Sequence, residues 1–233
     1  MGPAKPLKTI VITQSNYIPW KGFFDTIRKA DEVVLYDDMQ YTRRDWRNRN
    51  KIKTPQGMQW LTIPVEVKGR FFQKINETIV SNPHWTAHHW KSIQLNYKKA
   101  PCFDEMRDFV EYLYRDSRSD NLSQINYWFL TEISKWMGIH TNFCFSSKYI
   151  LEEERTDRLV GICKQSEATD YYTGPAAKEY LNEDKFNQAG IKVHYIDYSG
   201  YPEYPQLYPP FEHAVSIIDL LMHTGKNCTR FMK

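Results

Sequence analysis

The chain has 233 residues, of which 41% are hydrophobic and 15% aromatic, and its formal net charge is +3. This length suits one α/β domain, or one domain with a substantial insertion, and the composition excludes an intrinsically disordered chain. The small net charge gives no reason to expect whole-protein attraction to nucleic acid or to membranes.

The cysteines and the hydropathy of the chain indicate the cellular compartment in which the protein is expected. The four cysteines are widely spaced and form no CxxC pair, so neither a cysteine zinc site nor a disulfide framework is expected. The N-terminal MGPAKPLK lacks the apolar stretch of a signal peptide. No apolar run approaches the roughly 18 residues that a membrane-spanning helix needs. We therefore expect a cytoplasmic protein with reduced thiols and no membrane span.

The first predicted unit is a strand, a helix and a second strand. Residues 9–13 (TIVIT) are β-branched and apolar, which predicts a buried parallel strand. Pro19 favours the start of a helix over residues 20–29, and residues 32–37 (EVVLYD) form the second strand. The usual right-handed crossover between two such strands begins a Rossmann-like sheet.

The rest of the chain predicts a helical block between two α/β flanks. Strands are expected at 60–67, 75–80, 142–146, 169–173 and 192–198, and helices at 84–97, 103–114, 123–137, 157–165, 174–180 and 215–223. Ser123 is the expected N-cap of its helix, and Gly138 the expected stop. The pattern predicts an α/β fold with a Rossmann-like, mostly parallel sheet and an inserted helical block. Residues 1–82 and 139–233 are assigned to the α/β core, and residues 83–138 to a helical insertion or lid.

A basic run occupies residues 40–53, with the sequence QYTRRDWRNRNKIK. It holds six cations against one acid. Guanidinium groups bind phosphates and carboxylates in bidentate fashion, and an aromatic ring among them stacks on a base or sugar. We predict a loop that binds a phosphorylated ligand; the alternative is a solvated, charged surface loop. The candidate binding residues are Arg44, Trp46, Arg47, Arg49 and Lys51.

A second candidate site follows the first strand. Ligands of open α/β sheets bind outside the carboxyl ends of the strands, where helix N-termini favour anions. The residues expected there are Gln14, Asn16, Tyr17 and Trp20. The layout is similar to nucleotidyl transferases with an HxGH signature, but the matching residues 19–23 read PWKGF and lack both histidines. The alternative is an ordinary helix start anchored by Trp20.

Asp37 and Asp38 end the second predicted strand. Side chains alternate along a strand, so only one of the two carboxylates is expected to enter a site, as a base or a metal ligand. Asp38 is the candidate because it is nearer the basic run. The alternative is a turn carboxylate, or a salt bridge to the arginines that follow.

Two further groups complete the candidates. His84 and His88 share a helix face, and His88 is a candidate base. HxxxH lacks the glutamate of HExxH and a third ligand, so no metal site is predicted; the alternative is surface or core histidines. Thr173 and Lys178 flank the Gly-Pro that opens the helix at 174–180, where a second anion pocket or a well-capped turn is expected.

Several segments resemble the WbqC-like protein family. They are QSNYIPWKGFFDTI, VVLYDDMQYTRRDWRNRNKIKTPQGMQWLTIPV, DYYTGPAAKEYL and SIIDLLMHTG, in the order the family shows. The resemblance implies a bacterial, cytoplasmic transferase of O-antigen (lipopolysaccharide) or other surface-polysaccharide biosynthesis. It implies transfer of an acyl or aminoacyl group, glycyl being one candidate, to the amine of a nucleotide-linked amino sugar. It supplies no catalytic residues.

Such an amide-forming reaction needs a base for the sugar amine and hydrogen-bond donors for an oxyanion. His88 or Asp38 is the expected base, and Asn48 the expected donor. The expected partner is a nucleotide-linked sugar or another phosphorylated small molecule, and the sequence does not specify a cofactor. Two other functions stay open: an ATP-dependent nucleotidyl transferase or ligase of HxGH-like layout, and a single-stranded nucleic-acid-binding module. The small net charge disfavours the latter.

Overall fold

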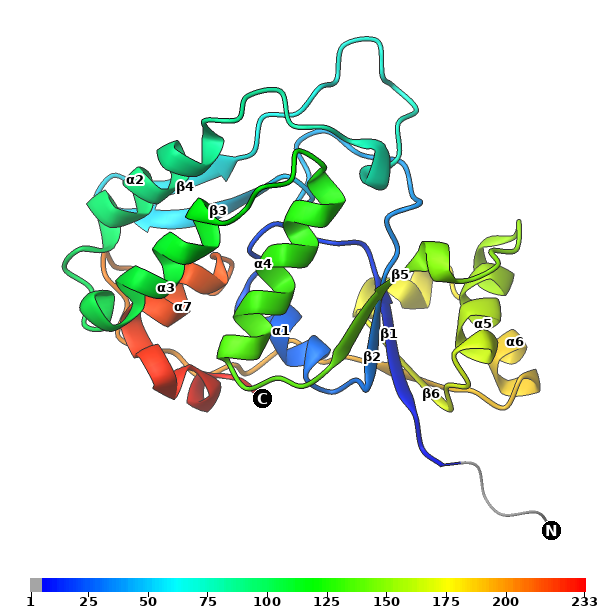
Figure 1. Ribbon diagram of the computed structural model, residues 1–233. Helices are drawn as coiled ribbons and strands as arrows, with labels where there is room; N and C mark the ends of the chain where they lie inside the picture. Colours follow the sequence, from blue (N-terminus) through cyan, green and yellow to red (C-terminus); the bar gives the residue numbers. More distant parts are fainter. Residues whose placement is uncertain (1–5) are drawn as a thin grey trace.

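Five parallel strands form the central sheet of the computed structural model, which describes residues 6–233 (Figure 1). They are β1 (Thr9–Thr13), β2 (Glu32–Leu35), β5 (Asn142–Phe145), β6 (Asp170–Thr173) and β7 (Lys192–Tyr195). Their order is β5-β2-β1-β6-β7, so the direction of winding reverses between β1 and β6. The predicted α/β fold with a parallel sheet is confirmed. The prediction of no signal peptide concerns a segment whose first five residues lie outside the described range.

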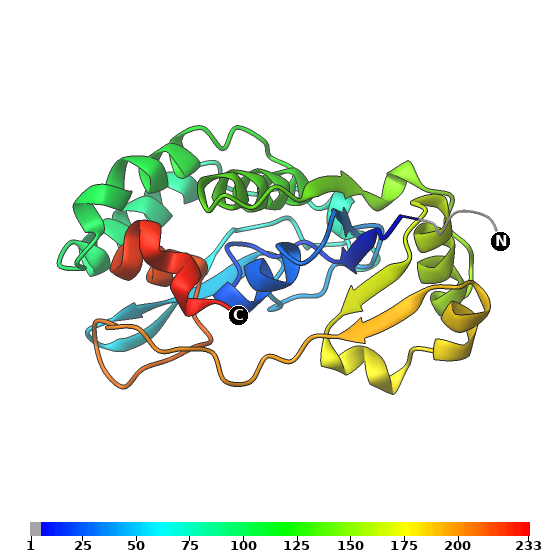
Figure 2. The same cartoon turned by 90° about the horizontal axis from the view of Figure 1, so that it is seen from below.

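Both faces of the sheet are buried, because alternate side chains of its strands pack into cores on opposite sides. Val11 of β1 belongs to one hydrophobic core, whereas Ile10 and Ile12 belong to another. On the first face lie α1 (Lys21–Ile27) and α4 (Leu122–Trp136), and on the second lie α5 (Arg155–Gln165) and α6 (Glu183–Gln188) (Figure 2). Such two-sided burial explains why β1 reads as a continuous apolar run.

The predicted helical block is confirmed as α2 (Trp85–Tyr97), α3 (Phe103–Arg115) and α4, inserted between β2 and β5. Its apolar side chains share one core with α1, with one face of the sheet and with α7 (Ile217–Thr224). The assignment of 83–138 as a separable insertion or lid stays a prediction. Ser123 was the wrong N-cap, because Asn121 accepts the capping hydrogen bond from the Gln124 amide. Gly138 ends the helix with φ of +72°, as expected.

The basic run is not a loop throughout. Its second half forms β3 (Arg49–Thr54), which pairs with β4 (Gly57–Thr62) in an antiparallel hairpin. The sequence carried the signal, because cations alternate with Asn50 and Ile52, the period of a half-buried strand. The strand predicted at 60–67 is therefore shifted and shortened. The strand predicted at 75–80 is wrong: a 3-10 turn, η1 (Ile75–Glu77), is followed by isolated bridges.

Shorter segments complete the fold. Three more 3-10 turns are η2 (Ser146–Lys148), η3 (Pro175–Glu179) and η4 (Gly225–Phe231). The helix predicted at 174–180 is thus the 3-10 turn η3, while α6 was not predicted. Among residues 6–233, no helix combines the length and apolar character needed to cross a membrane.

Candidate functional site

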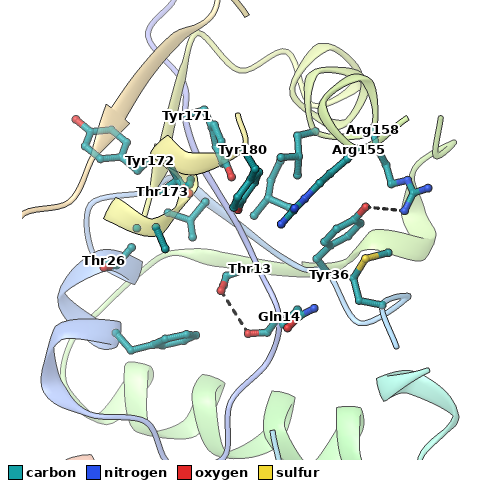
Figure 3. A pocket seen from close by; sticks show the side chains of 18 of the residues that line it. Thr13, Gln14, Thr26, Tyr36, Arg155, Arg158, Tyr171, Tyr172, Thr173 and Tyr180 are labelled. Atoms are coloured by element: carbon teal, nitrogen blue, oxygen red, sulfur yellow. Dashed lines mark hydrogen bonds between the residues drawn. The ribbon is translucent and has the colours of Figure 1, made fainter. Parts of the chain in front are cut away.

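A crevice of about 670 Å³ opens at the carboxyl ends of β1 and β6 (Figure 3). This is the point at which the strand order reverses, the usual ligand position in open α/β sheets. The volume lies within the range of small-molecule sites, roughly 300–1,000 Å³. Its polar and aromatic lining includes Thr13, Gln14, Tyr36, Arg47, Arg155, Arg158, Tyr172, Thr173 and Tyr180.

Three arginines give the crevice a positive charge. Arg155 and Arg158 come from the first turn of α5, and Arg47 comes from the segment before β3, while Glu153 is the one acid among the described residues that line it. Arg155 and Arg158 are one turn apart, so they share a face of the helix. This arrangement favours an anionic ligand, because guanidinium groups match phosphate and carboxylate geometry.

Aromatic rings accompany the two helix arginines. Figure 3 shows Arg155 against the ring of Tyr180 and Tyr36 turned toward Arg158. The Arg155 guanidinium carbon lies 3.4 Å from the Tyr180 ring centroid, and Arg158 Nη1 donates a 3.2 Å hydrogen bond to the Tyr36 hydroxyl. Arg158 Nε and Nη2 donate hydrogen bonds to the backbone carbonyls of Glu152 and Glu153, at 2.7 and 2.8 Å. Arg158 is thus fixed in place, whereas Arg155 is held only by its stack.

Arg47 ties the hairpin to the loop after β1. Its guanidinium donates to the Asn16 side chain and, at 3.4 Å each, to the carbonyls of Gln14 and Ser15. Burial lowers the pKa of Arg47, and the nearby carboxylate of Asp45, at 3.7 Å, acts in the opposite direction. Arg47 Nε is buried and has no hydrogen-bond partner among the described residues. The predicted residues Gln14, Asn16 and Arg47 therefore form one connected unit at the crevice.

Asp37 holds the same loop in place through hydrogen bonds. Its carboxylate accepts a 2.8 Å hydrogen bond from the Ser15 amide and another from the Ser123 hydroxyl. Asn126 of α4 donates to Ser15 Oγ and to the Arg47 carbonyl, at 2.9 Å in both cases. Burial raises the pKa of Asp37 despite these hydrogen bonds. Asp37, which is 1% exposed, therefore positions the loop rather than facing the ligand space.

Other predicted residues of the first loop lie in packed surroundings. Tyr17 is fully buried, and its hydroxyl bonds His89 Nδ1 at 2.9 Å and the Tyr114 hydroxyl at 2.7 Å. Trp20 packs on Gly22: a Cβ at Gly22 would meet the Trp20 ring at 2.3 Å. The space beside Gly22 thus accommodates this ring rather than a ligand.

Asn48 is a buried residue of the hairpin and does not line the crevice. Its Nδ2 donates a 2.8 Å hydrogen bond to the Ile63 carbonyl, while its Oδ1 is buried and has no partner among the described residues. The amide therefore holds the start of β3 against the segment that follows β4. Its predicted role as an oxyanion donor stays a proposal.

Trp46, Arg49 and Lys51 of the basic run lie together on the outer face of the β3–β4 hairpin. Trp46 and Trp60 lie with ring centroids 5.4 Å apart, and both are partly exposed. The Arg49 guanidinium lies 3.9 Å from the Trp60 ring centroid, and the Lys51 amine lies 5.1 Å from it. Arg44 is exposed, and its carbonyl accepts a hydrogen bond from Arg49. None of these predicted residues is among the described residues that line the crevice.

Asp38 lies in a neighbouring hollow of about 350 Å³ at the ends of β2 and β5. Its carboxylate accepts hydrogen bonds from the Asn76 amide, at 3.1 Å, and from the Ser146 hydroxyl. The chain from Tyr36 to Met39 separates this hollow from the crevice, because Tyr36 and Met39 line the crevice while Asp38 lines the hollow.

Of the remaining predicted residues, His88 and Lys178 are not among the described residues that line the crevice, whereas Thr173 is. His88 is exposed beside a third hollow, of about 370 Å³, between β4 and α2. Lys178 is exposed, and its amine lies over the Tyr195 ring, whereas Thr173 of the same predicted pocket does line the crevice. In the described part of the chain, no three His, Cys, Asp or Glu side chains are grouped as metal ligands.

Comparison with known proteins assigns the family. The sequence matches the WbqC-like protein family across residues 14–231. The chain belongs to this family. It is also 46% identical, over 97% of its length and 98% of the relative, to a protein of Mycobacterium tuberculosis (strain ATCC 25618 / H37Rv) called "Uncharacterized protein Rv1507c". No solved structure matches the chain.

The lining residues of this WbqC-like protein that the sequence did not predict include Tyr36, Arg155, Arg158 and Tyr180. A usable signal existed for the two arginines. Any helix that follows a parallel strand begins at the carboxyl edge of the sheet, so cations in its first turn face that edge. The Glu154 side chain caps α5, because it accepts hydrogen bonds from the Thr156 and Asp157 amides.

Proposed function

We propose that this WbqC-like protein binds a nucleotide-linked amino sugar in the crevice and transfers an acyl or aminoacyl group, glycyl among the candidates, to its amine. The step belongs to the synthesis of a surface polysaccharide such as O-antigen. Amide formation joins the amine nitrogen to the acyl carbon, releases the donor's leaving group, and requires a base to take the amine proton.

One observation carries the proposal: three arginines converge at the point where the strand order of a Rossmann-like sheet reverses. A diphosphate fits such a cluster, since each phosphate offers several acceptor oxygens to planar donors. The rings of Tyr180 and Tyr36 provide faces for a base or sugar beside the charged groups. The cavity has the volume of a small-molecule site, which disfavours a macromolecular ligand there.

Asp38 is the base to test first. It lies in the hollow next to the crevice, only two residues along the chain from Tyr36. Asp38 can act only on a sugar whose amine reaches past the chain between Tyr36 and Met39 into this hollow. His88 is the second choice, because no described residue that lines its hollow is a chain neighbour of a residue that lines the crevice.

Calorimetry with UDP- and dTDP-linked amino sugars tests the binding step. A ligand at 100 times its Kd stabilises the fold by about 2.7 kcal/mol, so thermal unfolding gives a parallel readout. The expected result is binding by the wild type and by the surface control Arg118→Ala, and strong loss in the double variant Arg155→Ala/Arg158→Ala. Binding of all three proteins with equal affinity would refute the crevice as the site.

Mass spectrometry tests the transfer step. The amino sugar should gain the mass of the acyl group in the presence of an activated donor, whereas the matched sugar with a hydroxyl in place of the amine should bind but gain nothing. Release of AMP or pyrophosphate from ATP would instead support the ligase alternative. Binding of unrelated oligonucleotides with steep salt dependence, without nucleotide-sugar binding, would support the nucleic-acid module.

A further inference from the structure

Residues 66–74 form a loop that projects from the body of the molecule between β4 and η1 (Figure 1, cyan, at the top). Phe71 and Phe72 in this loop are 73% and 81% exposed, and their ring centroids lie 5.0 Å apart. Isolated exposed apolar residues are common on proteins, but two adjacent aromatic rings on a projecting loop are typical of an interaction site.

Hydrogen bonds to the preceding segment hold the loop in this shape. The Gln40 side chain donates to the Phe71 carbonyl at 2.9 Å, and the Tyr41 amide donates to the Gln73 carbonyl at 2.9 Å. Within the loop, Gln73 Nε2 donates to the Glu66 carbonyl at 2.8 Å. The backbone is therefore anchored on both sides of the phenylalanines, and the anchored backbone directs the two rings into solvent.

Cations surround the two rings. Lys68, Arg70 and Lys74 are exposed within the loop, and Arg43 donates a 2.9 Å hydrogen bond to the carbonyl of Val67. Arg70 is paired with Glu66 at 2.6 Å. Lys68, Lys74 and Arg43 form no salt bridge with any residue in 6–233. The loop thus combines apolar rings with uncompensated positive charge.

We propose that this loop docks the protein on membranes that contain anionic phospholipid. Phe71 and Phe72 enter the boundary between headgroups and acyl chains, while Lys68, Lys74 and Arg43 contact the lipid phosphates. Aromatic side chains favour that boundary, and basic residues are attracted to the negative surface of anionic membranes. Two rings and three cations give reversible peripheral binding, since neither feature alone anchors a protein. The proposal is independent of the ligand in the crevice.

Vesicle cosedimentation tests the proposal. The wild type should bind vesicles of phosphatidylcholine with phosphatidylglycerol, should not bind pure phosphatidylcholine vesicles, and should lose binding at high salt. The variant Phe71→Ser/Phe72→Ser should bind these vesicles at least roughly tenfold more weakly, because it has no aromatic rings to transfer from water into the membrane. The matched control Ile150→Ser removes a side chain that is 79% exposed elsewhere, and should bind like the wild type.

A charge variant gives a second readout. Lys68→Ala should weaken binding to the anionic vesicles about fivefold, as expected for one cation near the lipid surface. Unchanged melting temperatures of these variants show that they fold. The proposal is overturned if the wild type ignores anionic vesicles, or if the double phenylalanine variant binds them equally well. It is also overturned if sedimentation equilibrium shows a dimer that only the double variant loses, because a second copy then covers the rings.

Discussion

Replacing Arg155 by alanine separates ligand binding from folding. The Arg155 side chain is exposed and lies over the Tyr180 ring, and within residues 6–233 it forms no hydrogen bond or salt bridge. An exposed cation–π contact contributes about 0.5–1 kcal/mol. For a chain of this size, a loss of about 1 kcal/mol lowers the melting temperature by roughly 2–4 °C. Arg155→Ala should therefore remain folded at ambient temperature.

Binding should respond much more strongly. A hydrogen bond to a charged group contributes about 1.5–3 kcal/mol. Loss of the Arg155 contact to a phosphate should therefore weaken the binding of a UDP-linked amino sugar roughly 10- to 150-fold. Calorimetry of Arg155→Ala against the wild type measures this change. Arg155→Lys keeps the charge but not the planar fork, and should lie between the two.

Two results would refute this reasoning. An unchanged Kd in Arg155→Ala would show that the arginine does not contact the ligand. A melting temperature lowered by more than about 4 °C would show that Arg155 has a structural role larger than its one contact implies. The control Arg118→Ala removes a cation with an 85% exposed side chain outside the crevice, and should change neither quantity.

Three further predictions concern stability. Burial lowers the pKa of His89 from 6.5 to about 4. The unfolded chain therefore binds a proton before the folded protein does, and urea unfolding should show a loss of about 3 kcal/mol of stability between pH 6.5 and pH 4. The variant His89→Gln should not show this loss. Gly22→Ala places a Cβ against the Trp20 ring and should destabilise the fold by about 1–3 kcal/mol in the same assay. Burial tends to raise the pKa of Glu32, but hydrogen bonds from Lys8 and Tyr149 lower it from 4.5 to about 2. In thermal unfolding, Glu32→Gln should therefore destabilise the folded protein by about 3 kcal/mol at pH 7, where the carboxylate is charged, and by little at pH 2.

Each of these has a contrary outcome. The control His88→Ala changes an exposed neighbouring histidine and should lose the same stability between pH 6.5 and pH 4 as the wild type. If His88→Ala, and not His89→Gln, removed this loss, the assignment to His89 would be contradicted. A free energy of unfolding that is unchanged or raised in Gly22→Ala would mean that the Trp20 ring moves at no cost. For Glu32→Gln, a destabilisation that is as large at pH 2 as at pH 7 would exclude the charge of the carboxylate as its origin.

The sequence by itself determined the sheet and the position of the ligand space. Apolar runs such as residues 9–13 are local features that specify buried parallel strands, and the carboxyl end of a parallel strand is a binding edge whatever packs around it. Gln14 and Thr173 follow directly from that rule, because each lies at the end of such a strand. Arg47 was found for a different reason, the charge of its neighbourhood.

The tertiary structure decided which side chains of each candidate segment face the crevice. Within the basic run, Arg47 lines it while Arg49 and Lys51 lie on the outer face of a hairpin, because the direction of a side chain on a strand depends on pairing with a later segment. Arg155 and Arg158 join Arg47 only because the tertiary packing brings the end of β1 and the start of α5 to the same crevice. No local pattern encodes that convergence, since it follows from the packing of segments that are distant in the chain.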